Sequence, residues 1–205
     1  MNLDRLDGPT RALLALAAAV ATGREELVEQ RAAECAGSSV PGRWVDEVLL
    51  QSTLIVGWPK ALAAFAVWRR IGASEPAAFA SADDETPEHW RVRGEAVCRE
   101  VYGKNYAKLR ANIRALHPEL DAWMLEEGYG RTLGRPGLDL ARRELAVAVQ
   151  MAVQGAGPQL HAHLVGALNA GAAASAISEM LELVRPVLGT NEAELTMALW
   201  ERIRR

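Results

Sequence analysis

The sequence matches itself at an offset of 132 residues, so that residues 11–71 align with residues 143–203 without a gap. The identical positions include a glycine that ends the first helix, a glycine before the last helix, and a Trp-x-Arg-Ile ending. A four-helix unit of this length buries too little apolar surface by itself, so we expect the two copies to pack together as a pseudo-dimer. Identical pairs include Arg11/Arg143, Leu13/Leu145, Gly23/Gly155, Glu47/Glu179, Gly57/Gly189, Trp68/Trp200 and Ile71/Ile203.

The composition favours helices around one substantial core. Long runs of alanine, leucine, glutamate and arginine dominate over β-branched clusters, and aromatic residues make up 5% of the chain. Half of the 205 residues are hydrophobic, which suffices for a large core. We therefore predict an all-α fold of two tandem helical repeats. The first repeat is placed at residues 1–71, a linker at 72–87, and the site-bearing second repeat at 88–205.

Charge and cysteine usage exclude several classes of protein. Positive and negative side chains are mixed along the chain, and the net charge is −3. Without a block of lysine or arginine, the sequence argues against a nucleic-acid partner or an anionic membrane partner. Cys35 and Cys98 are far apart and show no CxxC spacing, so neither a disulfide framework nor a cysteine zinc site is predicted. Such cysteines suit a reducing compartment, and we predict a cytoplasmic protein.

Residues 11–21 resemble the apolar region of a signal peptide, with small residues where cleavage would fall. The segment before this run carries Asp4 and Asp7 against a single Arg5, which is a poor positively charged region. The run is also too short to span a bilayer. We therefore predict that it forms a helix of the mature protein.

Residues 142–171 predict a helical hairpin that carries the functional site. Residues 144–154 are apolar almost all the way round, which suits a helix enclosed by its neighbours. Residues 155–158, Gly-Ala-Gly-Pro, then end this helix, because the glycines supply a C-cap and the proline fits the first turn of the next helix.

The second helix of the hairpin carries His161 and His163 on the borders of its apolar stripe. Two residues of separation place them about 200° apart around the helix axis, so they cannot chelate one metal ion together. We predict no metal site. Either histidine could reach a cleft or a subunit interface, and periodicity does not choose between these. Acid–base chemistry would belong to the second copy alone, since Glu144, His161 and His163 correspond to Ala12, Glu29 and Arg31.

Two charged pairs are kept in both copies. Arg11 occurs with Glu47 in the first repeat, and Arg143 occurs with Glu179 in the second. Residues kept by both copies are best interpreted as architectural. Our hypothesis is therefore an ion pair within each repeat that ties its first helix to its third.

Several motifs in the second half form a set: YGR at 129–131, RPGLD at 135–139, REL at 143–145, QLHAH at 159–163 and GALNAG at 166–171. Together they resemble the carboxymuconolactone decarboxylase family, within the alkyl hydroperoxidase D-like superfamily. Residues 47–50 and 57–59 resemble the closing segment of the same domain. The resemblance implies a helical bundle and a ring-like assembly, for which a homotrimer is the expected form.

The superfamily also contains peroxidases whose proton relay uses a glutamate, a CxxC pair and a histidine. By resemblance the glutamate falls on Glu144 and the histidine on His163, while the two cysteines would fall on Ala156 and Gln159. Reduction of peroxide needs a thiolate and a resolving partner. The resemblance therefore disfavours a peroxidase and favours the decarboxylase branch.

Loss of CO₂ from a small carboxylated lactone, or a related acid, needs no cofactor if cations hold the substrate carboxylate and a donor protonates the dienolate. The resemblance implies His163 as the proton donor, with Glu144 as its partner. The alternatives are a peroxidase-like oxidoreductase and a non-catalytic oligomeric binding module. The expected substrate-binding residues are Arg131, Arg135, Tyr129 and His161.

A straight antiparallel hairpin would separate Glu144 from His163. Glu144 lies eleven residues before Gly155, and His163 lies five residues after Pro158. At about 1.5 Å per residue, their heights along the hairpin differ by roughly 9 Å. Direct contact would need crossed helices or a bridging water, so the pairing rests on the resemblance.

Overall fold

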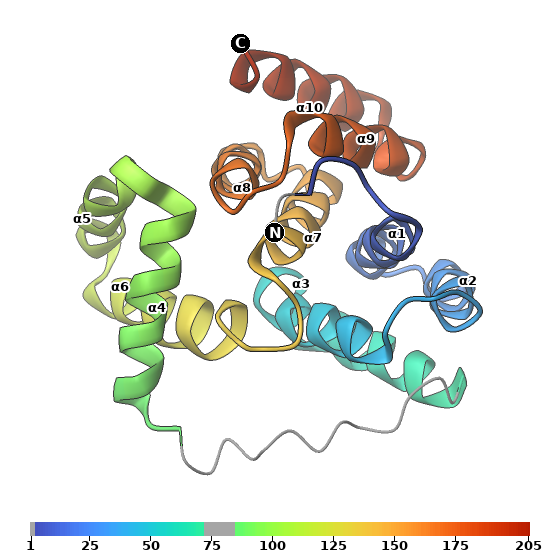
Figure 1. Cartoon of the computed structure of the whole chain (residues 1–205), viewed down its shortest axis with the longest axis horizontal. Helices are drawn as coiled ribbons and strands as arrows, with labels where there is room; N and C mark the ends of the chain where they lie inside the picture. The colour runs from blue at the N-terminus through green and yellow to red at the C-terminus, as the bar shows by residue number, and fades with distance from the viewer. Residues whose placement is uncertain (1–2, 72–84) are drawn as a thin grey trace. The chain divides into compact units, whose positions relative to one another are not determined.

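The computed structural model describes residues 3–71 and 85–205, and these residues form helices joined by short connections (Figure 1). The single β pairing among them is an isolated parallel bridge between Leu3 and Ala172. The prediction of an all-α fold is confirmed.

The chain divides into two compact units. One unit is formed by residues 1–76 and 137–205, and the other by residues 77–136. Of the expected linker, residues 72–84 lie outside the part of the chain that the structure describes. The segment expected as the second repeat, 88–205, contributes helices to both units.

The larger unit contains the two helical repeats. Helices α7, α8 and α9 of the second repeat each begin 132 residues after α1, α2 and α3 of the first. In chain order the helices are α1 (Gly8–Thr22), α2 (Glu25–Ala36), α3 (Gly42–Ile71), α7 (Leu140–Val153), α8 (Gly157–Asn169), α9 (Ala174–Val184), the 3-10 helix η4 (Arg185–Val187) and α10 (Thr190–Ile203).

The glycine before the last helix of the first repeat is a break in the backbone. Helix α3 is kinked at Gly57, whose φ of 80° and ψ of 162° are not helical. In the second repeat the same position is Gly189, the residue before α10, so the two halves of α3 correspond to α9 and α10. Gly23 and Gly155, which follow the first helix of each repeat, have matching left-handed φ values of 72° and 67°.

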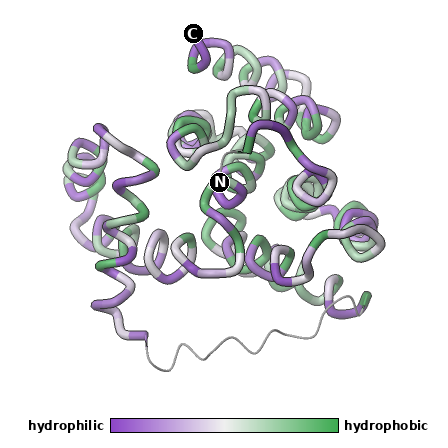
Figure 2. Tube along the Cα trace, viewed as in Figure 1, coloured by the Kyte–Doolittle hydropathy of each residue, from purple (hydrophilic) through white to green (hydrophobic). Residues whose placement is uncertain are grey.

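The core of this unit is built around α1 and α7, which pack against each other and are hydrophobic along most of their length (Figure 2). The last helical segment of each repeat carries a buried tryptophan whose indole makes an equivalent hydrogen bond. The indole of Trp68 donates to Asp46 at 3.0 Å, and that of Trp200 donates to Ser178 at 2.8 Å. Asp46 and Ser178 also differ by 132, so one contact occurs twice.

A surface hollow occurs at the same nine positions of each repeat. This correspondence means that the backbone of the repeat, rather than a particular side chain, creates the hollow. The first hollow is lined by Val20, Gly23, Glu25, Val28, Pro59, Lys60, Ala63, Ala64 and Val67, and the second by Ala152, Gly155, Gly157, Leu160, Asn191, Glu192, Leu195, Thr196 and Leu199.

The conserved charges pair between the repeats, which corrects the hypothesis of a pair within each repeat. Arg143 Nη2 lies 2.7 Å from Glu47 Oε2, and Arg11 Nη1 lies 3.3 Å from Glu179 Oε2. In a twofold arrangement, residue i of one copy meets residue j of the other and the reverse also holds. The exchanged partners are therefore what a pseudo-dimer requires.

Helix α3 is long and apolar enough, by length and composition, to cross a membrane. However, the kink at Gly57 divides it into two short segments. Its first segment also lies in the protein core, where Val45, Val48 and Leu49 are fully buried. Such burial is what the core helix of a folded unit shows.

The smaller unit places two helices in backbone contact. Residues 129–133 form the second half of the π-helix η3. A Cβ atom at Gly130 would overlap the carbonyl oxygen of Trp90, and one at Gly94 would overlap that of Leu125. These glycines serve close packing rather than a turn. The elements are α4 (Pro87–Tyr102), the 3-10 helix η2 (Gly103–Asn105), α5 (Tyr106–Leu116), α6 (Pro118–Trp123) and η3 (Met124–Leu133).

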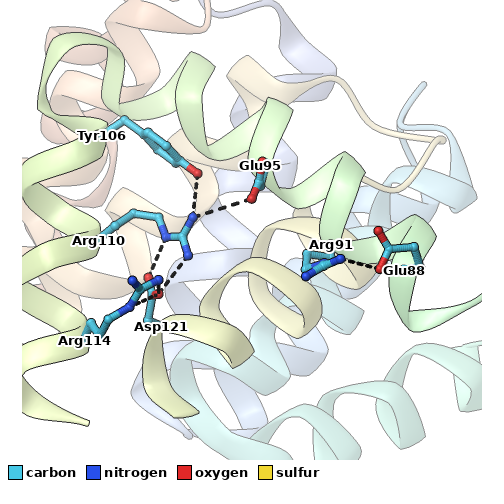
Figure 3. Close-up of polar contacts among 7 residues, drawn as sticks. All are labelled: Glu88, Arg91, Glu95, Tyr106, Arg110, Arg114 and Asp121. Carbon is cyan, nitrogen blue, oxygen red and sulfur yellow. Dashed lines mark hydrogen bonds and ion pairs between the residues drawn. The ribbon is translucent and has the colours of Figure 1, made fainter. Parts of the chain in front are cut away.

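A buried carboxylate fixes α6 against α5 in the smaller unit (Figure 3). Asp121 is 2% exposed and accepts from Arg110 Nε at 2.6 Å and from Arg114 Nη2 at 2.5 Å. The hydrogen bond from Arg110 is the main reason why the pKa of Asp121 lies below its usual value. Arg110 also donates to the Tyr106 hydroxyl at 3.0 Å.

Candidate active site

Three consecutive charged residues are buried at the start of α7: Arg142, Arg143 and Glu144. Successive residues of a helix point about 100° apart, so the three side chains reach three different neighbours. Arg142 reaches the N-terminus of α1, Arg143 reaches α3, and Glu144 reaches α8. The first turn of α7 is therefore connected to α1, α3 and α8 by buried polar side chains.

Arg143 donates hydrogen bonds to three neighbouring residues. Its Nη2 donates to Glu47, its Nε to the carbonyl of Leu138 at 3.2 Å, and its Nη1 to Gln51 at 3.3 Å. Gln51 in turn donates to the carbonyl of Arg143 at 3.1 Å. Both charged side chains are 0% exposed. A buried charge requires such partners, and this network fixes the backbone next to Glu144.

Arg142 joins the N-termini of α1 and α7. Asp7 and Asp139 cap these helices, and Arg142 donates to both carboxylates, at 3.0 Å and 2.7 Å. Its guanidinium also lies 4.4 Å from the centre of the Trp44 ring. Burial acts to raise the pKa of Asp7, but hydrogen bonds from Thr10 and the charge of Arg142 hold it below its usual value. Sequence reasoning missed this residue, since its counterpart in the first repeat is Thr10.

Glu144 and His163 are in direct contact. The Oε2 atom of Glu144 lies 2.8 Å from Nδ1 of His163. The Glu144 side chain is 0% exposed, whereas the His163 side chain is 10% exposed. The structure therefore brings together the two residues that the resemblance implied, with the carboxylate inside and the imidazole nearer the surface.

The contact corrects the height difference expected from the sequence. Helix α7 ends at Val153 and α8 begins at Gly157. Glu144 is nine residues from the first of these ends and His163 is six residues from the second, so their heights differ by about 5 Å. Long side chains bridge an offset of this size.

The contact with Glu144 decides which ring nitrogen of His163 carries the hydrogen. Among the described residues, Oε1 of Glu144 is buried and has no hydrogen-bond partner. An ionised carboxylate only accepts hydrogen bonds, so Nδ1 of His163 must carry the hydrogen in that state. Nε2 is then the ring nitrogen that Glu144 leaves available. A histidine oriented in this way can exchange a proton with a bound molecule.

The remaining site candidates belong to α8 and to the smaller unit. His161 is exposed on α8. Tyr129, Arg131 and Arg135 belong to the smaller unit. Tyr129 is buried and donates to the Tyr102 hydroxyl at 3.1 Å, while Arg131 binds Glu127 at 3.1 Å and stacks over Trp90.

Arg135 is half-buried in the smaller unit, and its charge contributes to the low pKa of Glu85. The hydrogen bond from Arg93 is the main cause that lowers this pKa to about 2. Of the predicted site residues, the larger unit therefore brings together Glu144 and His163.

The two cysteines lie apart from the Glu–His pair in sequence and are buried. Burial raises the pKa of the Cys35 thiol to about 12, so this residue holds almost no thiolate at neutral pH. Cys98 is buried in α4 of the smaller unit. The positions that a CxxC motif would occupy, Ala156 and Gln159, lie at the start of α8. Among the described residues, no group of three or more His, Cys, Asp or Glu could hold a metal ion.

Fold and site together define a fused, two-repeat helical bundle with a Glu–His pair in one repeat. The family model of the carboxymuconolactone decarboxylase family matches residues 2–70 and 118–202, and the chain belongs to this family. Residues 71–117, which include α4, η2 and α5, lie between the matched segments. A comparison with curated protein sequences found no match.

Proposed function

We propose that this protein is a cofactor-free carboxy-lyase that acts on a small carboxylated lactone or a related acid. The observation that carries the proposal is the 2.8 Å contact between Glu144 and His163 in a member of this family. The first repeat has Ala12 and Arg31 at the equivalent positions, so each chain would hold one site.

The proposed reaction begins with cleavage of the carbon–carbon bond to the substrate carboxylate. CO₂ leaves, and the electron pair of the broken bond delocalises into the lactone as a dienolate. Protonated His163 then delivers the Nε2 proton to carbon, and the imidazole recovers a proton from solvent. The net change is one carboxylate and one proton converted to one C–H bond and one CO₂. Glu144 stabilises the imidazolium and fixes its orientation, which is the role of a buried carboxylate beside a catalytic histidine.

The test is release of CO₂ from a panel of carboxylated lactones and related acids. Removing a general acid typically costs 10²–10⁴-fold, so His163→Ala should lower kcat by about 100-fold or more. Glu144→Gln should also lower kcat, with less effect on KM, because the amide cannot stabilise the imidazolium. The matched control is Arg31→Ala, which changes the equivalent position of the first repeat, where Arg31 pairs with Glu34 at 2.7 Å.

Unchanged turnover in His163→Ala would remove this histidine from the mechanism. If no acid in the panel turns over but one raises the Tm, the binding module becomes the better proposal. Peroxide reduction is disfavoured because Cys35 is a buried thiol with a raised pKa. Peroxide consumption that disappears when both cysteines are replaced by alanine would restore that alternative.

The other proposals taken from the resemblance are tested separately. Replacement of a substrate-binding residue should raise KM more than it lowers kcat. A homotrimer should show a mass of about three chains by light scattering. A cytoplasmic location should appear in cell fractionation. The proposed substrate-binding residues are Tyr129, Arg131, Arg135 and His161.

A further inference from the structure

We propose that Gln51 is a positioning residue for the contact between Glu144 and His163, because it holds the peptide group that leads into Glu144. Gln51 belongs to the first repeat, so that repeat contributes to a site carried by the second. The effect of Gln51 on turnover rests on the proposed carboxy-lyase function. Its effect on the orientation of His163 does not.

The side-chain amide of Gln51 contacts Arg143 at two points. Its Nε2 donates to the carbonyl of Arg143 at 3.1 Å, and its Oε1 accepts from the guanidinium Nη1 at 3.3 Å. That carbonyl belongs to the peptide bond that joins Arg143 to Glu144. One amide therefore restrains both the backbone and the side chain of the residue immediately before the buried carboxylate.

Burial strengthens this restraint. Gln51, Arg143 and Glu144 are all 0% exposed. Gln51 also lies one helical turn after Glu47 in α3, so both residues reach α7 from the same face of their helix. Breaking a contact in this network would leave a buried polar atom without a partner. The network therefore favours a single arrangement of α3 and α7 at this point.

The internal repeat shows that the fold does not require this amide. The equivalent of Gln51 in the second repeat is Leu183, whose side chain makes no hydrogen bonds. The equivalent of Arg143 is Arg11, and the residue after Arg11 is alanine rather than glutamate. The fold thus tolerates leucine at this position. The amide occurs in the copy of the contact where a glutamate follows the arginine.

The placement of Glu144 depends strongly on its backbone. Its Oε2 lies 2.8 Å from Nδ1 of His163, but its Oε1 has no hydrogen-bond partner among the described residues. A carboxylate held at one oxygen can rotate or shift unless its backbone is fixed. An acid–base pair must keep its geometry within about 0.5 Å to remain productive. The amide of Gln51 supplies the restraint that the carboxylate itself lacks.

The tautomer of His163 tests the proposal without any substrate. Imidazole ¹⁵N NMR of the full chain, at a pH where the ring is neutral, should show the hydrogen on Nδ1 in the wild type. Gln51→Leu, which introduces the residue found at position 183, should move a measurable part of the population to the Nε2–H tautomer. Gln51→Met keeps the length of the side chain without its amide. It should have the same effect, and it replaces Gln51→Leu if leucine prevents folding.

Turnover tests the catalytic consequence. With an acid that the wild-type protein decarboxylates, Gln51→Leu should lower kcat by roughly 10- to 100-fold, as expected when a catalytic group is misplaced. KM should change by less than about twofold, because substrate binding is not altered. A wild-type kcat in a variant with the altered tautomer would overturn the catalytic part of the proposal. If the wild type decarboxylates no acid in the panel, the proposed function fails, and the tautomer still decides the role of Gln51.

A second buried contact between α3 and α7 provides a matched control. Ser52 accepts from Gln150 Nε2 at 2.7 Å, and the equivalent positions 184 and 18 carry valine and alanine. The double variant Ser52→Val/Gln150→Ala should therefore leave both the tautomer and kcat unchanged. A wild-type tautomer in both Gln51 variants would overturn the proposal. Equal effects in the double variant would also overturn it, because altered packing between α3 and α7 would then explain the result.

Discussion

The same ion pair occurs twice in this protein, in two different surroundings. Arg143 and Glu47 are both 0% exposed, whereas Arg11 and Glu179 are 45% and 22% exposed. The two pairs occupy equivalent positions of the repeats, but they differ in burial and in their other partners, because Glu179 also accepts from Arg5 at 2.8 Å. The comparison shows that two copies of one residue pair can contribute different amounts to the free energy of unfolding.

The largest expected effect is on the buried pair. Arg143→Ala leaves Glu47 buried without its cation, which should destabilise the protein by about 3–5 kcal/mol. Arg11→Ala should have little measurable effect, because solvent screens exposed pairs. Urea unfolding followed by circular dichroism measures both. Equal losses in the two variants would show that burial does not distinguish the pairs.

The second effect compares Gly57 with Gly189. Gly57 has a φ of 80° and a ψ of 162°, a region that is nearly restricted to glycine, so Gly57→Ala should cost about 1–3 kcal/mol. Gly189 has a φ of −64°, and an added Cβ would meet only the flexible end of Glu192. Gly189→Ala should therefore be nearly neutral in the same urea experiment. A neutral Gly57→Ala would mean that α3 does not need its kink.

The third effect compares the two indole hydrogen bonds. Trp68 donates to a carboxylate and Trp200 to a hydroxyl. Hydrogen bonds to charged groups contribute about 1.5–3 kcal/mol, against about 1 kcal/mol for neutral ones. Thermal unfolding should therefore show a larger decrease in Tm for Trp68 replaced by a naphthyl analogue than for Trp200 replaced in the same way. The reverse order would contradict the stronger hydrogen bond expected for Trp68.

The smallest expected effect is the change in stability with pH that comes from Glu179, the carboxylate of the exposed pair. A hydrogen bond from Arg5 is the main cause that lowers the pKa of Glu179 in the folded protein below the ordinary value of 4.5. Its contribution to stability is therefore complete above about pH 4.5 and is lost as the pH falls through the lower, folded-state value. Carboxyl NMR titration should show a midpoint for Glu179 below 4.5, and Arg5→Ala should raise it. A midpoint that does not respond to Arg5→Ala would contradict the assigned cause.

Much of this fold follows from local sequence signals. The end of α7 at Val153 and the start of α8 at Gly157 fall at or next to the Gly-Ala-Gly-Pro segment of residues 155–158, where turn chemistry places them. The break at Gly57 follows in the same way, because a backbone conformation restricted to glycine is a local property. The repeat itself was visible because its glycines and tryptophans occupy structural positions.

Features that depend on partners distant in sequence could not be predicted in this way. The offset of 132 residues does not say whether Arg143 meets Glu47 or Glu179, because both arrangements preserve the pattern. The contact between Glu144 and His163 depends on the observed ends of two helices. A glycine in a sequence is often interpreted as a turn, yet Gly130 allows close contact between helices, since a missing side chain serves either purpose.

The exchange of partners between repeats also affects how the chain is made. The contact between Arg143 and Glu47 joins residues 96 apart in sequence, and that between Arg11 and Glu179 joins residues 168 apart. A ribosome adding about 5–20 residues per second needs on the order of ten seconds to supply the second repeat. During that interval the apolar faces of α1 and α3 have no partner from the second repeat. The nascent first repeat is therefore the stage of synthesis at which a chaperone has most apolar surface to bind.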